Sequence, residues 1–126
     1  MSTLKERKLA HAHKYRGELW AKVKKSREQK LKSEFEYRGS KFQADDVSVR
    51  NMQIRLAGLP NGKIITWLDS QNNPHNFSDG DLEDMLGIIG DRGDHIYSKS
   101  WETKAMIMEV DDPINFDAVA YFEGLL

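Results

Sequence analysis

The first 32 residues constrain this chain most, because they are strongly basic and carry few apolar side chains. They contain eleven Lys or Arg against three Asp or Glu, a balance of +8, whereas residues 33–126 hold eight against seventeen, a balance of −9. Residues 3–32 lack proline and are rich in Lys, Arg, Glu, Leu and Ala, so they predict one long helix. We expect a basic helical arm over residues 1–32 that packs along a narrow seam only. The seam residues nearly share one face: Leu9, Ala12, Leu19 and Val23.

Within this arm, residues 24–30 make the strongest case for exposure, since they include no apolar side chain. A turn and a half of helix without apolar side chains has little to offer to a hydrophobic core. We therefore expect none of these residues to be buried, and we expect the arm to project from the rest of the protein.

Two β-hairpins are predicted in the middle of the chain. In residues 35–42, aromatic and charged side chains alternate on either side of a turn in which Gly39 can supply a positive φ. Residues 63–68 are the most strand-like segment, rich in β-branched and aromatic side chains. Residues 69–74 are expected to turn this strand back into a short partner that ends near Phe77.

Two helices are predicted to pack against these hairpins. The first begins at Asp45 or Asp46 and runs to about residue 57. Ser78 and Asp81 have the spacing of a capping box and open a second helix that continues to about residue 109. The first helix is expected to bury Val49, Met52, Leu56 and Ile54, and the second helix presents Leu82, Met85, Leu86, Ile89, Gly93, Ile96 and Ser100 on one stripe.

Pro113 ends the second helix, because proline cannot continue a helix and restrains the residue before it. The remaining segment is apolar and rich in aromatic residues. The predicted fold is α+β: a long N-terminal helix, two β-hairpins that form a small antiparallel sheet packed against two helices, and a short C-terminal helix or extended tail. The expected domains are a basic arm (1–32), a compact α+β domain (33–110) and an apolar tail (111–126).

The sequence offers little to a metal ion, a cofactor or a reaction. It contains no cysteine, and His11 and His13 would point about 200° apart on a helix. The acidic segment 69–84 lacks the Gly and Glu positions of a calcium loop, whichever Asp begins the count. Neither a serine elbow motif nor a glycine-rich phosphate loop is present. We expect no cofactor, no metal and no enzymatic activity. An apolar signal segment is not visible either, and no run of 18 apolar residues indicates a membrane span.

Both ends of the chain are candidates for binding a partner. Cations interspersed with aromatic residues could dock on an acidic protein or along nucleic-acid phosphates, and the third reading is a solvated helix without a partner. The acidic remainder of the chain disfavours nucleic acid. The candidate partner-binding residues are Lys14, Tyr15, Trp20, Lys24, Lys25 and Arg27 in the arm, and Phe116, Tyr121 and Phe122 in the tail.

Residues 23–104 resemble a small, poorly characterised domain of bacteriophage tail-fibre and tail-assembly proteins. The resemblance rests on the order of several short motifs rather than on any one of them. The motifs are the aromatic, glycine-containing hairpin 35–45 that ends in Phe42, Gln43 and Asp45, then Ser48, Asn51 and Ala57-Gly58, the turn with Trp67, Asp69 and Asn72, and Phe77-Ser78 before the long helix.

The resemblance implies a place in a phage tail, and it supplies no catalytic residues. It leads us to expect a tail-associated protein, either a virion component or a fibre adaptor, that binds other tail or fibre proteins. The alternatives are a fibre-assembly chaperone and a phage effector that binds nucleic acid or a host protein. A homo-oligomer is compatible with this context, with a trimer the plausible form, and so is a location in the virion tail or in the host cytoplasm during assembly.

Overall fold

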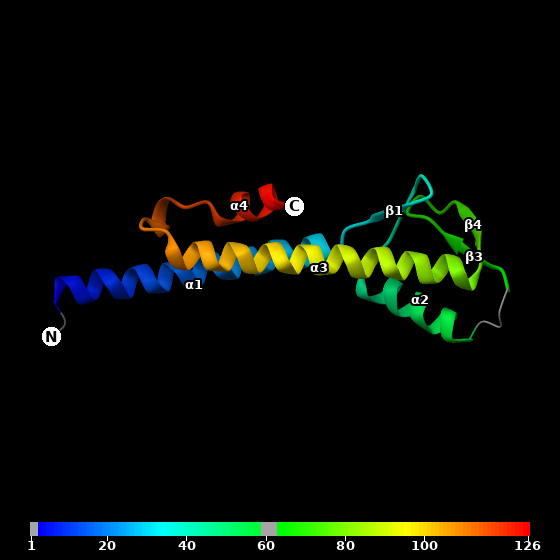
Figure 1. Cartoon of the computed structure of the whole chain (residues 1–126), viewed down its shortest axis with the longest axis horizontal. Helices are drawn as coiled ribbons and strands as arrows, with labels where there is room; N and C mark the ends of the chain where they lie inside the picture. Colours follow the sequence, from blue (N-terminus) through cyan, green and yellow to red (C-terminus); the bar gives the residue numbers. More distant parts are fainter. Residues whose placement is uncertain (1–2, 59–62) are drawn as a thin grey trace. The chain divides into compact units, whose positions relative to one another are not determined.

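The computed structural model describes residues 3–58 and 63–126. The α+β class is confirmed, with a long N-terminal helix and a short C-terminal one (Figure 1). No helix in these residues is long and apolar enough to cross a membrane. The elements in chain order are α1 (Leu4–Leu31), β1 (Phe35–Tyr37), β2 (Ser40–Phe42), α2 (Asp46–Gly58), β3 (Ile65–Leu68), β4 (Pro74–Phe77), α3 (Asp79–Glu109), a 3-10 turn (Pro113–Asn115) and α4 (Ala118–Leu125).

The chain forms two compact units. Unit 1 consists of Met1–Gln29 and His95–Leu126, and unit 2 consists of Lys30–Asp94. Unit 1 is therefore discontinuous in sequence and unit 2 is continuous. Most of the basic segment expected as an arm belongs to the same unit as the apolar C-terminal segment.

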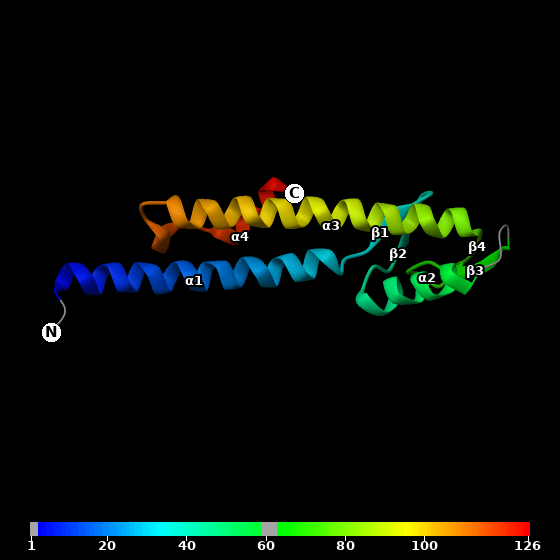
Figure 2. The ribbon, with the colours of Figure 1, turned by 60° about the horizontal axis from the view of Figure 1, so that its bottom comes forward.

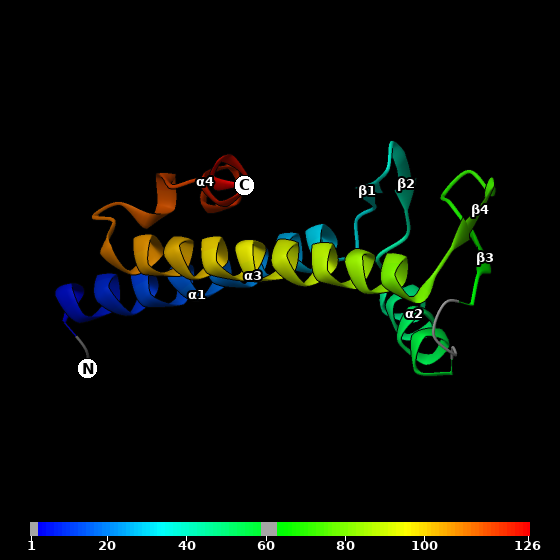
Figure 3. The same ribbon diagram turned by 45° about the vertical axis from the view of Figure 1, so that its right-hand side comes forward.

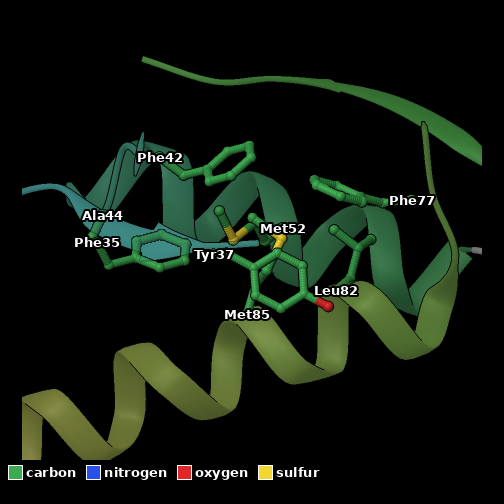
Figure 4. Packing of buried hydrophobic residues seen from close by; sticks show 8 residues of the cluster. All are labelled: Phe35, Tyr37, Phe42, Ala44, Met52, Phe77, Leu82 and Met85. Atoms are coloured by element: carbon green, nitrogen blue, oxygen red, sulfur yellow. The ribbon is translucent and has the colours of Figure 1, made fainter. Parts of the chain in front are cut away.

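Unit 2 has a core in which α2 and α3 meet aromatic side chains from the hairpins (Figure 4). Met52 of α2 faces Leu82 and Met85 of α3, and all three are fully buried. The predicted stripe of α3 therefore supplies the core of this unit. Trp67 is half-buried against it, whereas Ile54, expected to be buried, is 60% exposed. The buried residues of this core are Phe35, Tyr37, Phe42, Ala44, Met52, Phe77, Leu82 and Met85.

The two hairpins form two separate two-stranded antiparallel sheets instead of the single small sheet expected (Figure 3). In the first hairpin, Phe35 pairs with Phe42. Arg38 and Gly39 both have positive φ, of 51° and 81°, a combination typical of a type I′ turn. The glycine was predicted to take this conformation, but Arg38 adopts it despite its side chain.

The second hairpin is held by Asp69, a buried carboxylate in the turn between β3 and β4. The backbone N–H groups of Gln71 and Asn73 donate to its Oδ1, each at 2.9 Å, and Nε2 of His75 lies 2.9 Å from its Oδ2. The hydrogen bond from His75 and those from the backbone stabilise the charged form, which lowers the pKa of Asp69 from 3.8 to about 2.

Helix α3 begins with the predicted capping box. The Ser78 N–H donates to Asp81 Oδ2 at 2.9 Å, and the Asp81 N–H donates to Ser78 Oγ at 3.3 Å. The same Asp81 accepts a hydrogen bond from the hydroxyl of Tyr37 at 3.2 Å and forms an ion pair with Arg38 at 2.6 Å. The start of α3 is thereby tied to the first hairpin. The bond from the Ser78 N–H and the charge of Arg38 lower the pKa of Asp81, whereas burial and the Asp81 carboxylate raise the pKa of Tyr37.

In unit 1, residues 4–29 of α1 run alongside the second half of α3, and α4 packs on this pair (Figure 2). Leu19 and Val23 of the predicted seam are buried, as is Phe122 of α4, whereas Leu9 of the seam is 68% exposed. Ser26 is also buried, although the segment 24–30 was expected to be fully exposed. That expectation was wrong because a small hydroxyl can enter a core when it has a partner: Ser26 Oγ donates to Glu123 Oε1 at 2.9 Å.

At the C-terminus of each long helix, an arginine of the other long helix donates hydrogen bonds to the carbonyl groups. In unit 2, Arg92 of α3 donates from Nη2 to the carbonyl of Leu31 at 3.1 Å and to that of Ser33 at 2.8 Å, and from Nη1 to that of Glu34 at 2.8 Å. In unit 1, Arg16 of α1 donates to the carbonyls of Ile107 and Val110 at 3.1 and 2.8 Å. Carbonyls at a helix C-terminus lack intrahelical donors, and a cation there also favours the helix dipole. Both arginines therefore act as C-terminal caps.

Replacing Arg92 with methionine should lower the free energy of unfolding by about 2 kcal/mol, because three carbonyls lose a charged donor. Urea denaturation followed by circular dichroism measures the change. Arg50→Met, at an exposed position of α2, is the matched control and should change stability by less than about 0.5 kcal/mol. Equal losses for the two variants would contradict the capping role.

The Asp69 turn should make the stability of the protein depend on pH under acidic conditions. A carboxylate with a lowered pKa in the folded state contributes stability above its unfolded pKa and loses it as the pH falls through the folded value. The urea midpoints of the wild type and Asp69→Asn should therefore differ by a constant amount down to about pH 5 and converge between about pH 4 and pH 2. A gap that stays unchanged down to about pH 3 would argue against this role for Asp69.

Candidate functional site: a cationic aromatic face of unit 1

Two helices of unit 1 place aromatic and basic side chains opposite each other. Each helix contributes three such residues, at positions i, i+4 and i+7. This spacing places the three side chains on one side of their helix. We call this surface the cationic aromatic face. It consists of Trp20, Lys24 and Arg27 on α1 and Tyr97, Trp101 and Lys104 on α3.

Cations from both helices lie over the ring of Trp20. The Lys104 ammonium is 5.2 Å from the ring centroid, the Arg27 guanidinium carbon 5.6 Å and the Lys24 ammonium 5.9 Å. A cation within about 6 Å of a Trp ring is attracted by the negative face of the π system. The attraction of the Trp20 ring therefore offsets part of the repulsion among these three positive charges.

Arg27 is the best-anchored cation of the face. Its guanidinium lies 4.6 Å from the centroid of Tyr97, and Nη1 donates to Ser100 Oγ at 3.4 Å. Its side chain is 13% exposed, and Glu28 is its nearest carboxylate, 3.6 Å from Nε. Arg27 therefore fixes the two helices against each other, and the more exposed lysines are freer to meet a partner.

Trp101 is the most accessible aromatic residue of the face, with 60% of its surface exposed. Its ring centroid lies 5.8 Å from that of half-buried Tyr97. Lys24 and Lys104 are exposed as well. The face thus combines a large apolar ring at the surface with flanking ammonium groups, an arrangement suited to a partner that carries both apolar and acidic groups.

The face has no nucleophile poised for reaction. Ser100 Oγ donates to the carbonyl of Tyr97 at 2.7 Å, which commits its proton to the helix backbone. In unit 2, the Asp69–His75 pair is similar in chemistry to the orienting half of a catalytic triad. However, His75 packs against Phe42 and Phe77, and its Nε2 faces the Asp69 carboxylate. No group of three His, Asp or Glu side chains within residues 3–58 and 63–126 is placed to hold a metal ion.

The structure distributes the other predicted contact residues over unit 1. Lys14 and Lys25 are exposed. Tyr15 is half-buried and donates to the carbonyl of Ile114 at 3.2 Å. Phe116 and Tyr121 pack on each other, with ring centroids 5.6 Å apart.

Phe122 requires a correction, because its side chain is fully buried. The apolar C-terminal segment was expected to offer this ring to a partner. Instead, α4 carries Ala118 and Phe122 four residues apart, and both are buried in unit 1. Phe122 therefore belongs to the core of unit 1 and is no longer a candidate contact.

Half of the cationic aromatic face was not among the residues predicted from the sequence. Tyr97, Trp101 and Lys104 share the i, i+4, i+7 spacing that was used to find the apolar stripe of the same helix. A search for a second stripe, of aromatic and basic side chains, would have found them. Their alignment with the α1 triad depends on the pairing of two distant segments.

The family described as Domain of unknown function (DUF4376) matches residues 14–120. The chain therefore belongs to this family. The match is longer at both ends than the resemblance over residues 23–104, and it includes all six residues of the cationic aromatic face. No curated protein and no solved structure matches the chain.

Truncation of the two tryptophans of the face should have different effects on stability. Trp101→Ala should change the free energy of unfolding by less than about 0.5 kcal/mol, because this ring is mainly exposed. Trp20→Ala should cost about 1–2 kcal/mol, because a half-buried ring and its contacts with three cations are lost. Chemical denaturation followed by circular dichroism compares them. A larger loss for Trp101→Ala would mean that this ring supports the fold and is not available to a partner.

Proposed function

We propose that this member of the family is a bacteriophage tail-associated protein, a virion component or fibre adaptor that binds other tail or fibre proteins. The phage context rests on the order of the sequence motifs between residues 23 and 104. The binding role rests on the cationic aromatic face. In this proposal the protein acts in the virion tail, or in the host cytoplasm while tails are assembled.

The observation that carries the proposal is the exposure of Trp101 beside anchored Arg27 and Tyr97. Trp, Tyr and Arg are the residue types most enriched where protein interfaces gain their binding energy. Such side chains contribute when a partner covers them and excludes water. Trp101 has the required ring, and Arg27 and Tyr97 are already held in place, so a partner has few side chains to order on binding.

Charge indicates the chemistry of the partner. Three cations surround Trp20, and Glu28 is the carboxylate nearest to Arg27. A protein surface with carboxylates around an apolar centre would complement this face and would be steered to it. The acidic remainder of the chain supports a protein partner over a nucleic acid, since residues 30–94 hold eleven Asp or Glu against eight Lys or Arg.

The tail proposal is tested on particles produced by cells that express the chain from its own locus. Quantitative mass spectrometry of purified particles should find the wild-type protein at a fixed ratio to the other tail proteins. Trp101→Ala should lower this ratio at least several-fold, because the partner loses its apolar anchor. Ile88→Ala is the matched control, since it truncates another exposed apolar side chain of α3, on a different side of the helix from the face.

The other outcomes assign the chain to a different class. Co-purification with fibre proteins only before particles mature would indicate an assembly chaperone. The protein could instead co-purify with nucleic acid, in an association that nuclease treatment abolishes and salt steeply weakens. That result would indicate an effector and contradict the proposal. Particles without the chain and no tail protein bound to it would also contradict it.

A further inference from the structure

Strand β3 has one edge without a strand partner in the part of the chain that the structure describes, because its sheet contains only β3 and β4. The Asp69 N–H donates to the carbonyl of Asn73 just beyond the pairs Ile65–Phe77 to Leu68–Pro74. Since hydrogen-bonded and non-hydrogen-bonded pairs alternate in an antiparallel ladder, Thr66 and Leu68 direct their backbone groups to the other edge. Among the described residues these groups have no backbone partner, and the Ser70 N–H, just beyond the strand, donates to the carbonyl of Lys41 at 2.8 Å.

A groove runs along this strand. Its volume is about 400 Å³, and it lies between residues of β3 and residues at or near α2. We call it the β3 groove. Its lining residues are Gln43, Ser48, Asn51, Ile54 and Arg55 on one side and Thr66, Trp67 and Leu68 on the other.

The sequence of β3 lacks the charged residues and proline that protect many exposed edge strands. Proteins protect exposed edges with charged residues and proline. The β1–β2 hairpin carries charged residues such as Glu36 and Lys41, and β4 begins with Pro74. Strand β3 consists of Ile, Thr, Trp and Leu, without a charge or a proline. Its edge is therefore open to another strand.

Exposed apolar side chains lie beside this open edge. Ile54 of α2 is 60% exposed and Leu68 of β3 is 51% exposed, one on each side of the groove. A strand that pairs with β3 would place alternate side chains against these two residues. Gln43, Ser48 and Asn51 add polar groups for the remaining backbone positions.

We propose that the β3 groove binds an extended segment of a partner protein, which adds a third strand to the β3–β4 sheet. The segment would be about five residues long, with alternating apolar side chains and one carboxylate. The carboxylate follows from charge complementarity, because Arg55 is the only charged residue that lines the groove in the described part of the chain. This site lies in unit 2, and the inference does not depend on the cationic aromatic face or on a phage context.

The test uses the whole chain and a defined probe, the acetylated and amidated peptide VTVEV. In ¹H–¹⁵N correlation spectra, millimolar VTVEV should shift the amide signals of Thr66 and Leu68 in a saturable manner, with a Kd on the order of 1 mM. The peptide VTVKV should bind roughly tenfold more weakly, since its ammonium meets Arg55. A peptide N-methylated at the residues that face β3 should not bind, because it lacks the strand donors.

Two variants with matched exposure locate the site. Ile54→Gln should weaken VTVEV binding roughly tenfold, because it removes the apolar side of the groove without adding a charge. Val47→Gln should leave binding unchanged, since Val47 is 66% exposed on the same helix but does not line the groove. Both changes are at exposed positions, so circular dichroism should show a normal fold.

Several results would overturn the inference. These are an absence of shifts at several millimolar VTVEV, shifts confined to unit 1, equal binding of VTVKV, and equal effects of the two glutamine variants. Sedimentation of the protein alone covers a further case. A dimer that Ile54→Gln dissociates would assign the β3 edge to a second copy of this chain and not to a partner segment. A failure of the particle experiment with normal VTVEV binding would reject the tail function only.

Discussion

The fold depends on the arginine side chains that donate hydrogen bonds to the C-terminal carbonyl groups of the two long helices. Helix C-termini leave carbonyl groups without intrahelical donors, and burying these groups unpaired is costly. Here α1 ends on the guanidinium of Arg92, and α3 ends on that of Arg16. Each unit therefore contains one contact that is made only when the two helices are paired in register. The hydrophobic seam of α1 is too narrow to specify this register by itself.

This constraint also aligns the candidate binding surface. In unit 1, the register that places Arg16 at the end of α3 brings Trp20 to Lys104 and Arg27 to Tyr97. The cationic aromatic face is thus a product of helix pairing, with each helix supplying half of its aromatic and basic groups. The β3 groove has a different origin, since it arises where a short neutral strand lies next to α2.

Local patterns predicted much of the fold. The apolar stripe of α3, the capping box at Ser78 and the positive φ of Gly39 depend on residues a few positions apart, and all three are present. The burial of Ser26 could not be predicted in this way, because its partner Glu123 is 97 residues away. The contact between Arg27 and Tyr97 also joins residues that are far apart in sequence. For this reason the N-terminal segment alone could not predict Tyr97, Trp101 and Lys104, the half of the candidate site on α3.

The discontinuity of unit 1 has a consequence for the order of events during synthesis. Unit 2 is one continuous segment, so all of its core residues have been synthesised before the second half of unit 1 is translated. Residues 1–29 can complete the packing of unit 1 only after residues 95–126 have been synthesised, and the last of these include the buried Phe122. A helix with a wide apolar face would be prone to aggregation during that wait. The sparse, basic composition of α1 suits a segment that stays solvated until the final residues of the chain arrive.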